Sequence, residues 1–487
     1  MNHTTPTGLS ARLQVSLKPG DNSRVQAASS QRTRTAVVVL TGVLMSFLDV
    51  LIVNVAFPSI ARHFGELNVA RLSWVLNAYT IVFAALLVPA GRWADRVGRK
   101  RSFLIGLAMF TVASALCAAA PSLGILIGAR ILQAAGAAQL LPAAMGLLLP
   151  EFPPEKRSIA VALFAAVGGA GAAAGGPIGG LLTQLGWNWV FLINLPIGVF
   201  VLCAGARVLR EIRESTTTAR PDLLGALILA AGIGSLVLVI VKGRDWNWNS
   251  ISVGGFSTLA LAFILWFVSR SKTHPAPVVE FPMLRVRSFA MANISALFFA
   301  IAFSSMLLSG VMFLTDVWKS APWLLGLQLA PGPLMAAAFA VPAGKLCDRI
   351  GQRSVALAGV LIFVLGNAWW LWRLGAESGY STQFLPGLIF TGIGAGLSVP
   401  AVLSAAVAAL PAERLSTGSA VLNMSRQIGM ALGVAILVAI IGDSQGALGI
   451  AQFRYGFIAM GLAAVTSGLA CLALTGGKLI ANEGERP

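Results

Sequence analysis

The chain has 487 residues, of which 57% are hydrophobic and only 11% are charged, and its formal net charge is +17. A soluble globular protein carries about a quarter charged residues, so this composition excludes that class and indicates an integral membrane protein. The positive charge alone would also suit a nucleic-acid-binding protein, a class that the positions of the charges argue against.

The predicted elements begin after a polar N-terminal segment. Residues 1–35 are rich in Ser, Thr, Arg and Gln, so we expect a disordered cytoplasmic tail there. Fourteen apolar stretches follow, each long enough to cross about 30 Å of hydrocarbon as a helix. The expected spans are 36–57, 73–91, 103–120, 123–149, 158–185, 188–207, 223–241, 250–268, 289–315, 323–343, 354–372, 383–410, 416–441 and 455–475. Their apolar runs are unbroken, unlike the alternating strands of a membrane barrel, which predicts an all-α integral membrane protein with fourteen transmembrane helices.

Lys and Arg residues gather on one side of these spans. If the N-terminus is cytoplasmic, 26 of the 35 basic residues fall in inner segments and two within spans, Arg130 and Arg426. The other seven lie in outer loops: Arg62, Arg71, Lys242, Arg244, Lys319, Arg373 and Arg454. This positive-inside bias predicts a multi-pass protein of the plasma or inner membrane with both termini cytoplasmic. We expect its basic surface to face membrane lipids, with no nucleic-acid partner.

A charged, glycine-framed loop occurs twice in the chain. Residues 91–101 are echoed by residues 344–353 at an offset of 253. A second pair of similar segments, 136–142 and 394–400, has nearly the same offset, 258. Six spans thus match six spans, and parallel halves of this kind place a substrate site near the midplane between them.

The repeat divides the chain into parts. We expect a cytoplasmic tail over 1–35, an N-terminal six-helix half over 36–210, an inserted helix pair with basic loops over 211–288, a C-terminal six-helix half over 289–476 and a cytoplasmic tail over 477–487. An inserted pair of helices preserves the orientation of the second half, so both loop copies should lie on the cytoplasmic side.

Asp49 and Arg130 are charged residues at similar depths in two different spans. Asp49 lies 13 residues into the span 36–57, which is about 20 Å from the inner surface at about 1.5 Å per residue. Arg130 enters the span 123–149 from the outer side and lies about 10 Å deep, so the two charges can meet. Charged residues within membranes usually pair and mark proton or substrate pathways. We expect proton coupling by this pair, and the alternative is a static ion pair between two helices.

Other polar residues occur in the same spans. Gln133 and Gly136 follow Arg130 at three-residue steps on one helix face, so we expect them to line a cavity; a packing notch is the alternative. Three residues of the span 416–441 form a second group: Asn423, Arg426 and Gln427. Arg426 lies about 16 Å into its span and is the expected contact for an anion or substrate. Pairing with backbone carbonyls of a neighbouring helix is its alternative.

The span 158–185 is rich in glycine. Its most ordered motif consists of Gly175, Gly176, Pro177, Gly179 and Gly180. Small residues let helix backbones approach, and Pro177 allows bending, so we expect a moving interface at this motif. Packing alone is the alternative and would explain most of the glycines.

The two loop copies are expected to form a cytoplasmic gate. The residues concerned are Gly91, Asp95, Arg96, Gly98, Arg99, Lys100, Asp348 and Arg349. Glycine allows a tight turn, Asp95 can accept from N–H groups at a helix start, and the bases can pair with acids across the halves. A purely topogenic role of the bases is the alternative.

Several motifs follow one another along the chain: residues 48–58, residues 91–101, Arg130 with Gln133 and Gly136, residues 175–180, and residues 191–198. Together they resemble the fourteen-helix drug:proton antiporters, of the multidrug or quaternary-ammonium exporter type, in the major facilitator superfamily. The resemblance covers residues 36–475 and implies a substrate cavity that Asn54 helps to line. Two positions depart from it: Asn188 stands where relatives usually carry Arg, and Gln352 replaces a base in the second loop copy.

The function expected from this resemblance is proton-coupled export of lipophilic small molecules or drugs by alternating access. No phosphate-binding loop for ATP occurs, and His3, His63 and His274 lack metal-ligand spacing, so we expect no enzyme, no metal site and no cofactor, with a proton gradient as the energy source. The expected partners are the substrate, protons and lipids, and we expect a monomer. Export of a lipid or secreted metabolite is the first alternative, and a non-transporting membrane sensor is the second.

Overall fold

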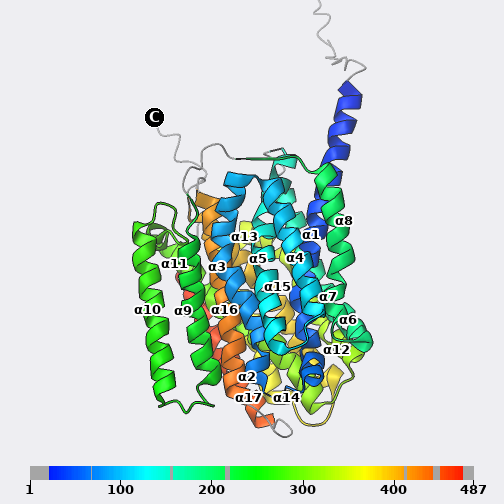
Figure 1. Ribbon diagram of the computed structural model, residues 1–487. Coiled ribbons are helices and arrows are strands. Elements are labelled where there is room, and N and C mark those ends of the chain that lie inside the picture. Colours follow the sequence, from blue (N-terminus) through cyan, green and yellow to red (C-terminus); the bar gives the residue numbers. More distant parts are fainter. Residues whose placement is uncertain are drawn as a thin grey trace, which may run out of the picture.

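The computed structural model describes residues 21–66, 68–153, 157–213, 220–410, 414–441 and 450–474. All regular elements in these ranges are helices, and they form one bundle of roughly parallel rods (Figure 1). Thirteen helical segments of the described residues are long and apolar enough to cross a bilayer. The 29-residue helix α6 (Arg157–Leu185) occupies the remaining predicted span. Each of the fourteen predicted spans therefore falls on a helix.

The first six predicted spans form eight helices. These are α1 (Asp21–Phe64), α2 (Val69–Leu72), α3 (Trp74–Val97), α4 (Arg99–Ala118), α5 (Leu123–Leu148), α6, α7 (Trp189–Leu192) and α8 (Asn194–Val208). A 3-10 turn, Leu149–Glu151, follows α5. The sixth span is divided into α7 and α8 because Pro196 has no N–H to donate to the carbonyl of Leu192.

The remaining spans form the inserted pair and the C-terminal half. The helices are α9 (Leu223–Lys242), α10 (Ile251–Thr273), α11 (Arg287–Met312), α12 (Pro322–Leu329), α13 (Pro331–Ile350), α14 (Gln352–Arg373), α15 (Leu385–Ala408), α16 (Leu415–Ile441) and α17 (Ile450–Leu472). A 3-10 turn, Phe281–Arg285, precedes α11, and π-helical turns occupy Phe313–Val317 and Tyr380–Phe384. Pro331 separates α12 from α13, again because proline lacks the donor that a continuous helix needs.

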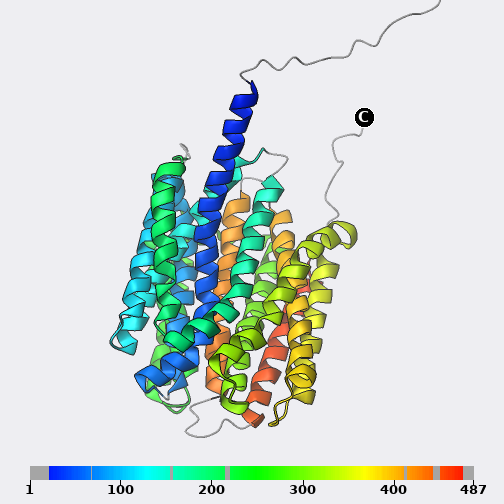
Figure 2. The same ribbon diagram turned by 90° about the vertical axis from the view of Figure 1, so that its right-hand side faces the viewer.

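The N-terminal helix is longer than predicted. α1 begins at Asp21, so residues 21–35, which we expected in a disordered tail, are helical. No glycine or proline interrupts the sequence between Asp21 and Thr41, and Gln31 Nε2 donates to the carbonyl of Val208 at 2.8 Å. The start of α1 projects beyond the bundle (Figure 2). Residues 1–20 and the predicted tail 477–487 lie outside the described residues.

The two halves pack in the same way. α1 contacts α6 as α11 contacts α16, α4 contacts α5 as α14 contacts α15, and α4 contacts α8 as α14 contacts α17. At the α4–α5 crossing, a Cβ added to Gly136 would lie 2.6 Å from the amide nitrogen of Phe110. A Cβ added to Gly394, at the α14–α15 crossing, would lie 2.6 Å from the nitrogen of Phe363. The sequence repeat therefore corresponds to repeated backbone packing.

The halves meet along two seams. One is formed by α3 and α16, and the other by α6 with α12 and α13. The inserted helix α9 packs against both α3 and α16, and α10 packs against α9 at the flank of the bundle (Figure 1). The inserted pair thus covers the first seam.

Candidate functional site

A buried ion pair joins α1 to α5 in the N-terminal half. Nη1 of Arg130 lies 2.7 Å from Oδ2 of Asp49, and the side chains are 1% and 0% exposed. The predicted meeting of these two charges is confirmed. Buried charges are costly unless they are both paired and hydrogen-bonded, so the surrounding groups determine whether the pair is satisfied.

Neutral donors complete the surroundings of the Asp49 carboxylate. Oδ1 accepts from Nε2 of Gln133 at 2.9 Å and from Nδ2 of Asn194 at 2.8 Å. The hydroxyl of Ser114 accepts from the same two amides at 2.8 and 3.2 Å. With Arg130, three donors therefore reach the carboxylate, which matches its ionised form because an ionised carboxylate can only accept.

Arg130 is held on several sides. Its Nη1 also donates to Oε1 of Gln133 at 2.6 Å, and its Nε donates to the carbonyl of Val75 at 3.2 Å. The guanidinium carbon lies 4.2 Å from the ring centre of Tyr79 and 5.9 Å from that of Phe191, within the range of cation–π attraction. The pair therefore connects α1, α3, α5 and the helices of the sixth span.

Sequence reasoning missed three members of this network: Tyr79, Ser114 and Asn194. Asn194 lies in the motif 191–198, and an amide in an apolar span was a signal that could have identified it. Ser114 gave no such signal, because single hydroxyls are common in membrane helices.

A small cavity lies between the halves beside the ion pair. Its volume is about 20 Å³, which is enough for about one water molecule. The lining residues are Val50, Asn54, Leu76, Tyr79, Thr80 and Arg130 of the N-terminal half and Ser304, Leu307, Met430 and Val434 of the C-terminal half. Asn54 lines this small cavity, and its place in a substrate cavity stays a prediction. Gln133 instead binds the ion pair, and Gly136 faces α4, so its structural position agrees with the packing alternative.

The polar residues of α16 lie on the helix that packs against α3. Asn423 Nδ2 donates to the carbonyl of Ser419 at 3.0 Å, and Gln427 is 8% exposed. Arg426 has a buried Nε with no hydrogen-bond partner, and among the described residues its guanidinium forms no ion pair or hydrogen bond. The alternative for Arg426, pairing with backbone carbonyls of a neighbouring helix, is therefore not found among the described residues. None of the three is among the residues that line the small cavity.

The first loop copy is capped by a carboxylate that the sequence analysis did not single out. Gly98 precedes α4 with φ of +116°, a conformation that favours glycine. Oε1 of Glu211 accepts from the backbone nitrogen of Lys100 at 3.0 Å. Asp95 pairs with Arg99, whose Nη2 lies 3.0 Å from Oδ1. At the start of α4, Glu211 thus occupies the position that we expected for Asp95.

The other residues of this loop are also placed by contacts with the N-terminal half. Gly91 packs against Pro142, whose Cβ would lie 3.5 Å from an added Cβ. Lys100 Nζ donates to the carbonyl of Ala206 at 2.8 Å, whereas Arg96 is exposed. These contacts attach the loop to α5 and α8, a structural role beyond topology alone.

An ion pair joins α3 to the segment before α11. Nη2 of Arg92 lies 2.9 Å from Oε1 of Glu280, and Nη1 donates to the carbonyl of Pro277 at 2.6 Å. Sequence reasoning had singled out neither Arg92 nor Glu280. In the second loop copy, Asp348 and Arg349 are exposed and form no ion pair with any described residue. Arg92 thus joins the N-terminal half to the inserted segment that precedes α11, and among the described residues the second loop copy makes no ion pair across the halves.

The glycine motif of α6 lies where this helix meets α1 and α12. Gly175 and Gly179 face α1, and a Cβ added to Gly175 would lie 2.7 Å from Cβ of Leu51. Gly176 faces α12, where a Cβ would lie 3.1 Å from the carbonyl oxygen of Gly326. A Cβ on Gly326 would in turn overlap the carbonyl of Gly176. Pro177 and Gly180 complete the motif inside α6, which forms a close joint between the halves.

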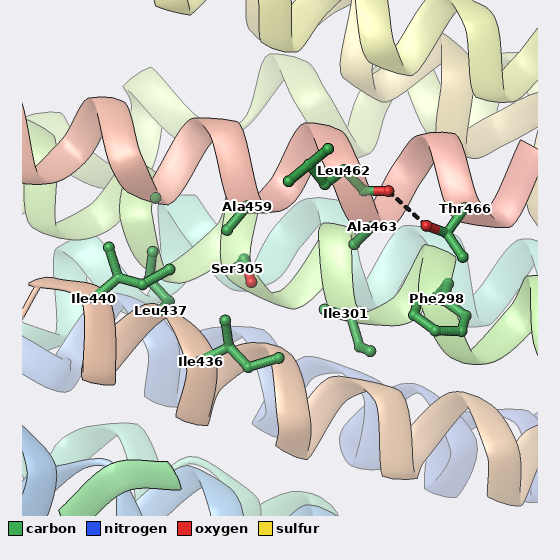
Figure 3. A pocket seen from close by; sticks show the side chains of 11 residues that line it. Phe298, Ile301, Ser305, Ile436, Leu437, Ile440, Ala459, Leu462, Ala463 and Thr466 are labelled. Carbon is green, nitrogen blue, oxygen red and sulfur yellow. Dashed lines mark hydrogen bonds between the residues drawn. The ribbon is translucent and has the colours of Figure 1, made fainter. Parts of the chain in front are cut away.

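A larger groove lies in the C-terminal half between α11, α16 and α17. It has a volume of about 260 Å³, and Figure 3 shows that apolar side chains from these three helices line it. The hydroxyls of Ser305 and Thr466 donate to the carbonyls of Gly433 and Leu462, respectively. Leu462 is 65% exposed, so the groove opens on the bundle surface that hydrocarbon would cover. It suits an apolar chain.

Comparisons with known proteins cover most of the sequence. A family model described as the Major Facilitator Superfamily matches residues 39–321 and 294–485. "Multidrug resistance protein Stp" of Mycobacterium tuberculosis is 33% identical, with 83% of this chain and 75% of that protein covered. "Puromycin resistance protein pur8" of Streptomyces alboniger is 33% identical, with 87% and 84% covered. "Methylenomycin A resistance protein" of Bacillus subtilis is 30% identical, with 90% and 93% covered.

Solved structures with a similar architecture include a POT family transporter in complex with 5-aminolevulinic acid. Its TM-score is 0.64 at 15% sequence identity, and the match covers 90% of this chain and 94% of that one. A bacterial homologue of the human drug peptide transporters PepT1 and PepT2 has a TM-score of 0.63 at 16% identity, with 91% and 98% covered. At these identities the likeness establishes the fold alone.

Proposed function

Because this chain belongs to the major facilitator superfamily, we propose that it is a proton-coupled secondary active exporter of lipophilic small molecules. The observation that carries the proposal is the buried Asp49–Arg130 pair beside a cavity between the halves. The names of the relatives, which are resistance proteins, support export of drug-like compounds. The positive-inside bias supports a plasma or inner membrane location with both termini in the cytoplasm.

In this mechanism Asp49 exchanges a proton. When ionised, its carboxylate accepts from Arg130, Gln133 and Asn194 and holds their helices together. Protonation removes the counter-charge of Arg130, and losing one partner of a buried pair costs about 3–5 kcal/mol. Moving a two-state equilibrium from about 1:99 to about 99:1 takes about 5.5 kcal/mol. One proton therefore has an effect large enough to bias the halves between two arrangements.

Transport then follows from alternating access. Substrate enters between the halves from the cytoplasm or the inner leaflet, the halves rock about the Gly176–Gly326 joint, and protonation of Asp49 from outside displaces the substrate. One charge that moves through about 100 mV yields about 2.3 kcal/mol, which supports a concentration gradient of about fiftyfold.

The test is Asp49→Asn in energised inverted vesicles. Asparagine keeps the shape of the side chain but cannot carry the proton, so we expect dye transport that is sensitive to an uncoupler to fall to the level of vesicles without the protein. Asp245→Asn, which changes an acid in an outer loop, is the matched control and should retain transport. Unchanged proton-coupled transport by Asp49→Asn would refute the proposal.

Export of a lipid or secreted metabolite is the second candidate function. The observation in its favour is the apolar groove between α11, α16 and α17, which could hold an acyl chain. The same vesicles can be loaded with a fluorescent phospholipid. Phospholipid movement that requires Asp49, without movement of any dye, would favour this candidate over drug export.

A further inference from the structure

Arg426 is a charged side chain near the middle of α16 that has no partner among the residues that the structure describes. It lies 11 residues after Leu415, the first residue of α16, which is about 16 Å along the helix at about 1.5 Å per residue. Its Nε is buried without a hydrogen bond, and its guanidinium has no partner among the described residues. Charged groups inside membranes usually pair, so a partner from outside the chain would account for this one.

The described residues supply no free anion at this depth. The charged side chains near the middle of the predicted spans are Asp49, Arg130 and Arg426. Asp49 is already matched by Arg130 at 2.7 Å. Other carboxylates of the described chain lie near helix ends, such as Asp222 at the start of α9 and Asp316 in the π turn after α11. The middle of the bundle therefore carries one uncompensated positive charge.

Arg426 lies one helical turn from the cavity between the halves. Met430 and Val434 follow it at four-residue steps on α16, and both line that cavity. Helical side chains lean toward the N-terminal end of their helix, which for α16 is the cytoplasmic end in the proposed orientation. The Arg426 side chain therefore lies on the same face of α16 as Met430 and Val434, on the cytoplasmic side of them. Gln427 and Asn423 add amide groups at the same level.

We propose that Arg426 binds an anionic group of the transported molecule, and that the exporter therefore prefers lipophilic anions. This inference rests on the proposed export function and names its substrate class: an oxyanion such as a carboxylate, sulfonate or phosphate on an apolar body. The planar guanidinium presents five donors that match oxyanions, and side chains such as Leu76 and Leu307 of the adjacent cavity suit the apolar body. A lipophilic cation would meet a like charge and no free carboxylate.

The experiment compares matched dyes in proteoliposomes that contain the full chain and carry an imposed proton gradient. The anionic probe is anilinonaphthalene sulfonate, the neutral probe is phenylnaphthylamine, which has the same rings without the sulfonate, and the cationic probe is ethidium. For the wild type we expect uncoupler-sensitive transport of the sulfonate to be the fastest. Arg426→Gln should lower the ratio of sulfonate to neutral rates by about tenfold or more, as expected for the loss of a hydrogen bond to a charged group. Arg426→Lys should lower it less, and the exposed Arg454→Gln should preserve it.

Two results would overturn the anion preference: faster transport of ethidium than of sulfonate by the wild type, or an unchanged ratio in Arg426→Gln. Absence of uncoupler-sensitive movement of every probe in the wild type would instead contradict the export function itself. If Arg426→Gln aggregates, the wild-type order of transport rates and the ratio of sulfonate to neutral rates in Arg426→Lys decide whether the anion preference holds.

A fluorescent phosphatidylglycerol in the same vesicles separates the two sources of the anionic group, which are a free small molecule and a lipid headgroup. Movement of that lipid that requires Arg426, without sulfonate transport, would support anion binding and identify a lipid phosphate as the source.

Discussion

The contacts of Asp49 fit either a static ion pair or a proton switch as long as the carboxylate is charged. Both forms would show one oxygen bound to Arg130 and the other to two amides. They differ when the charge is lost, because a static pair has only a structural role and a switch must change the preferred arrangement of the halves. Substitutions that remove the charges separately and together therefore separate the two roles.

We predict that Asp49→Asn and Arg130→Gln each destabilise the protein more than the double substitution does. Each single change leaves one buried charge without its partner, at about 3–5 kcal/mol, whereas two neutral amides can pair with each other. The melting temperature in detergent should therefore fall in both single variants and largely recover in the double variant. Proton-coupled transport should stay absent in all three. Recovery of transport together with stability would identify the pair as purely structural.

The glycine motif of α6 acts at the scale of helix packing. Gly176 and Gly326 bring α6 and α12 so close that a Cβ on Gly326 would overlap the Gly176 carbonyl and one on Gly176 would lie only 3.1 Å from the Gly326 carbonyl oxygen. A contact between bare backbones can slide without the interlocking of large side chains, which suits a surface about which two halves move. The same geometry would also suit a contact that does not move. The effect of one added methyl group on stability and on transport therefore tests the role of this contact.

We predict opposite effects for two glycine substitutions in neighbouring helices. In Gly326→Ala the methyl group would overlap the Gly176 carbonyl, and overpacking of this kind costs about 1–3 kcal/mol. In Gly344→Ala on α13 the methyl group would meet nothing within 4 Å, so the higher helix propensity of Ala should stabilise by about 0.5–1 kcal/mol. Melting temperature and transport rate should therefore both fall in the first variant, whereas in the second the melting temperature should rise slightly and the transport rate should be unchanged. Equal behaviour of the two variants would contradict a close joint.

Helix positions could be predicted from the sequence because hydropathy is local and additive along the chain. All fourteen spans were found in this way, and the meeting of Asp49 with Arg130 followed from counting residues along two helices. The polar start of α1 was missed because residues 21–35 lack the apolar signal on which span prediction depends.

Contacts between helices were less predictable than the helices themselves. Glu211 caps α4 from 111 residues away, and no local pattern marks that partnership. Gly136 follows Arg130 by six residues, yet it faces α4 and not the cavity, because six residues correspond to about 600° of rotation and leave the two about 120° apart around the helix axis. Contacts at the site were thus predicted where the depth of two residues in the membrane determines whether they meet. They were missed where the direction in which a residue faces around its helix axis determines the contact.

At the scale of the whole molecule, the Arg92–Glu280 pair links α3 of the N-terminal half to the segment that leads into α11 of the C-terminal half. Arg92 also donates to the carbonyl of Pro277, so the link has two parts. Movement that separates the halves at this end of the bundle, which is the cytoplasmic end in the proposed orientation, must break or stretch this link.

We predict that Glu280→Gln favours the arrangement that is open to the cytoplasm. The two side chains are 17% and 29% exposed, and pairs of this kind contribute about 0.2–1 kcal/mol. The substrate concentration for half-maximal uptake from the cytoplasmic side should therefore fall by up to about fivefold. Glu377→Gln, at an exposed acid before the π turn of α15, should leave this concentration unchanged. A rise in the concentration for Glu280→Gln would contradict the assigned role of the link.

The position of α9 has a consequence for how molecules dissolved among the acyl chains could approach the space between the halves. The helix packs along α3 and α16, whereas in the described chain no inserted helix packs over the contact of α6 with α12 and α13. A molecule that enters sideways from the bilayer must therefore pass the seam of α6 with α12 and α13, which the Gly176–Gly326 contact closes in this structure.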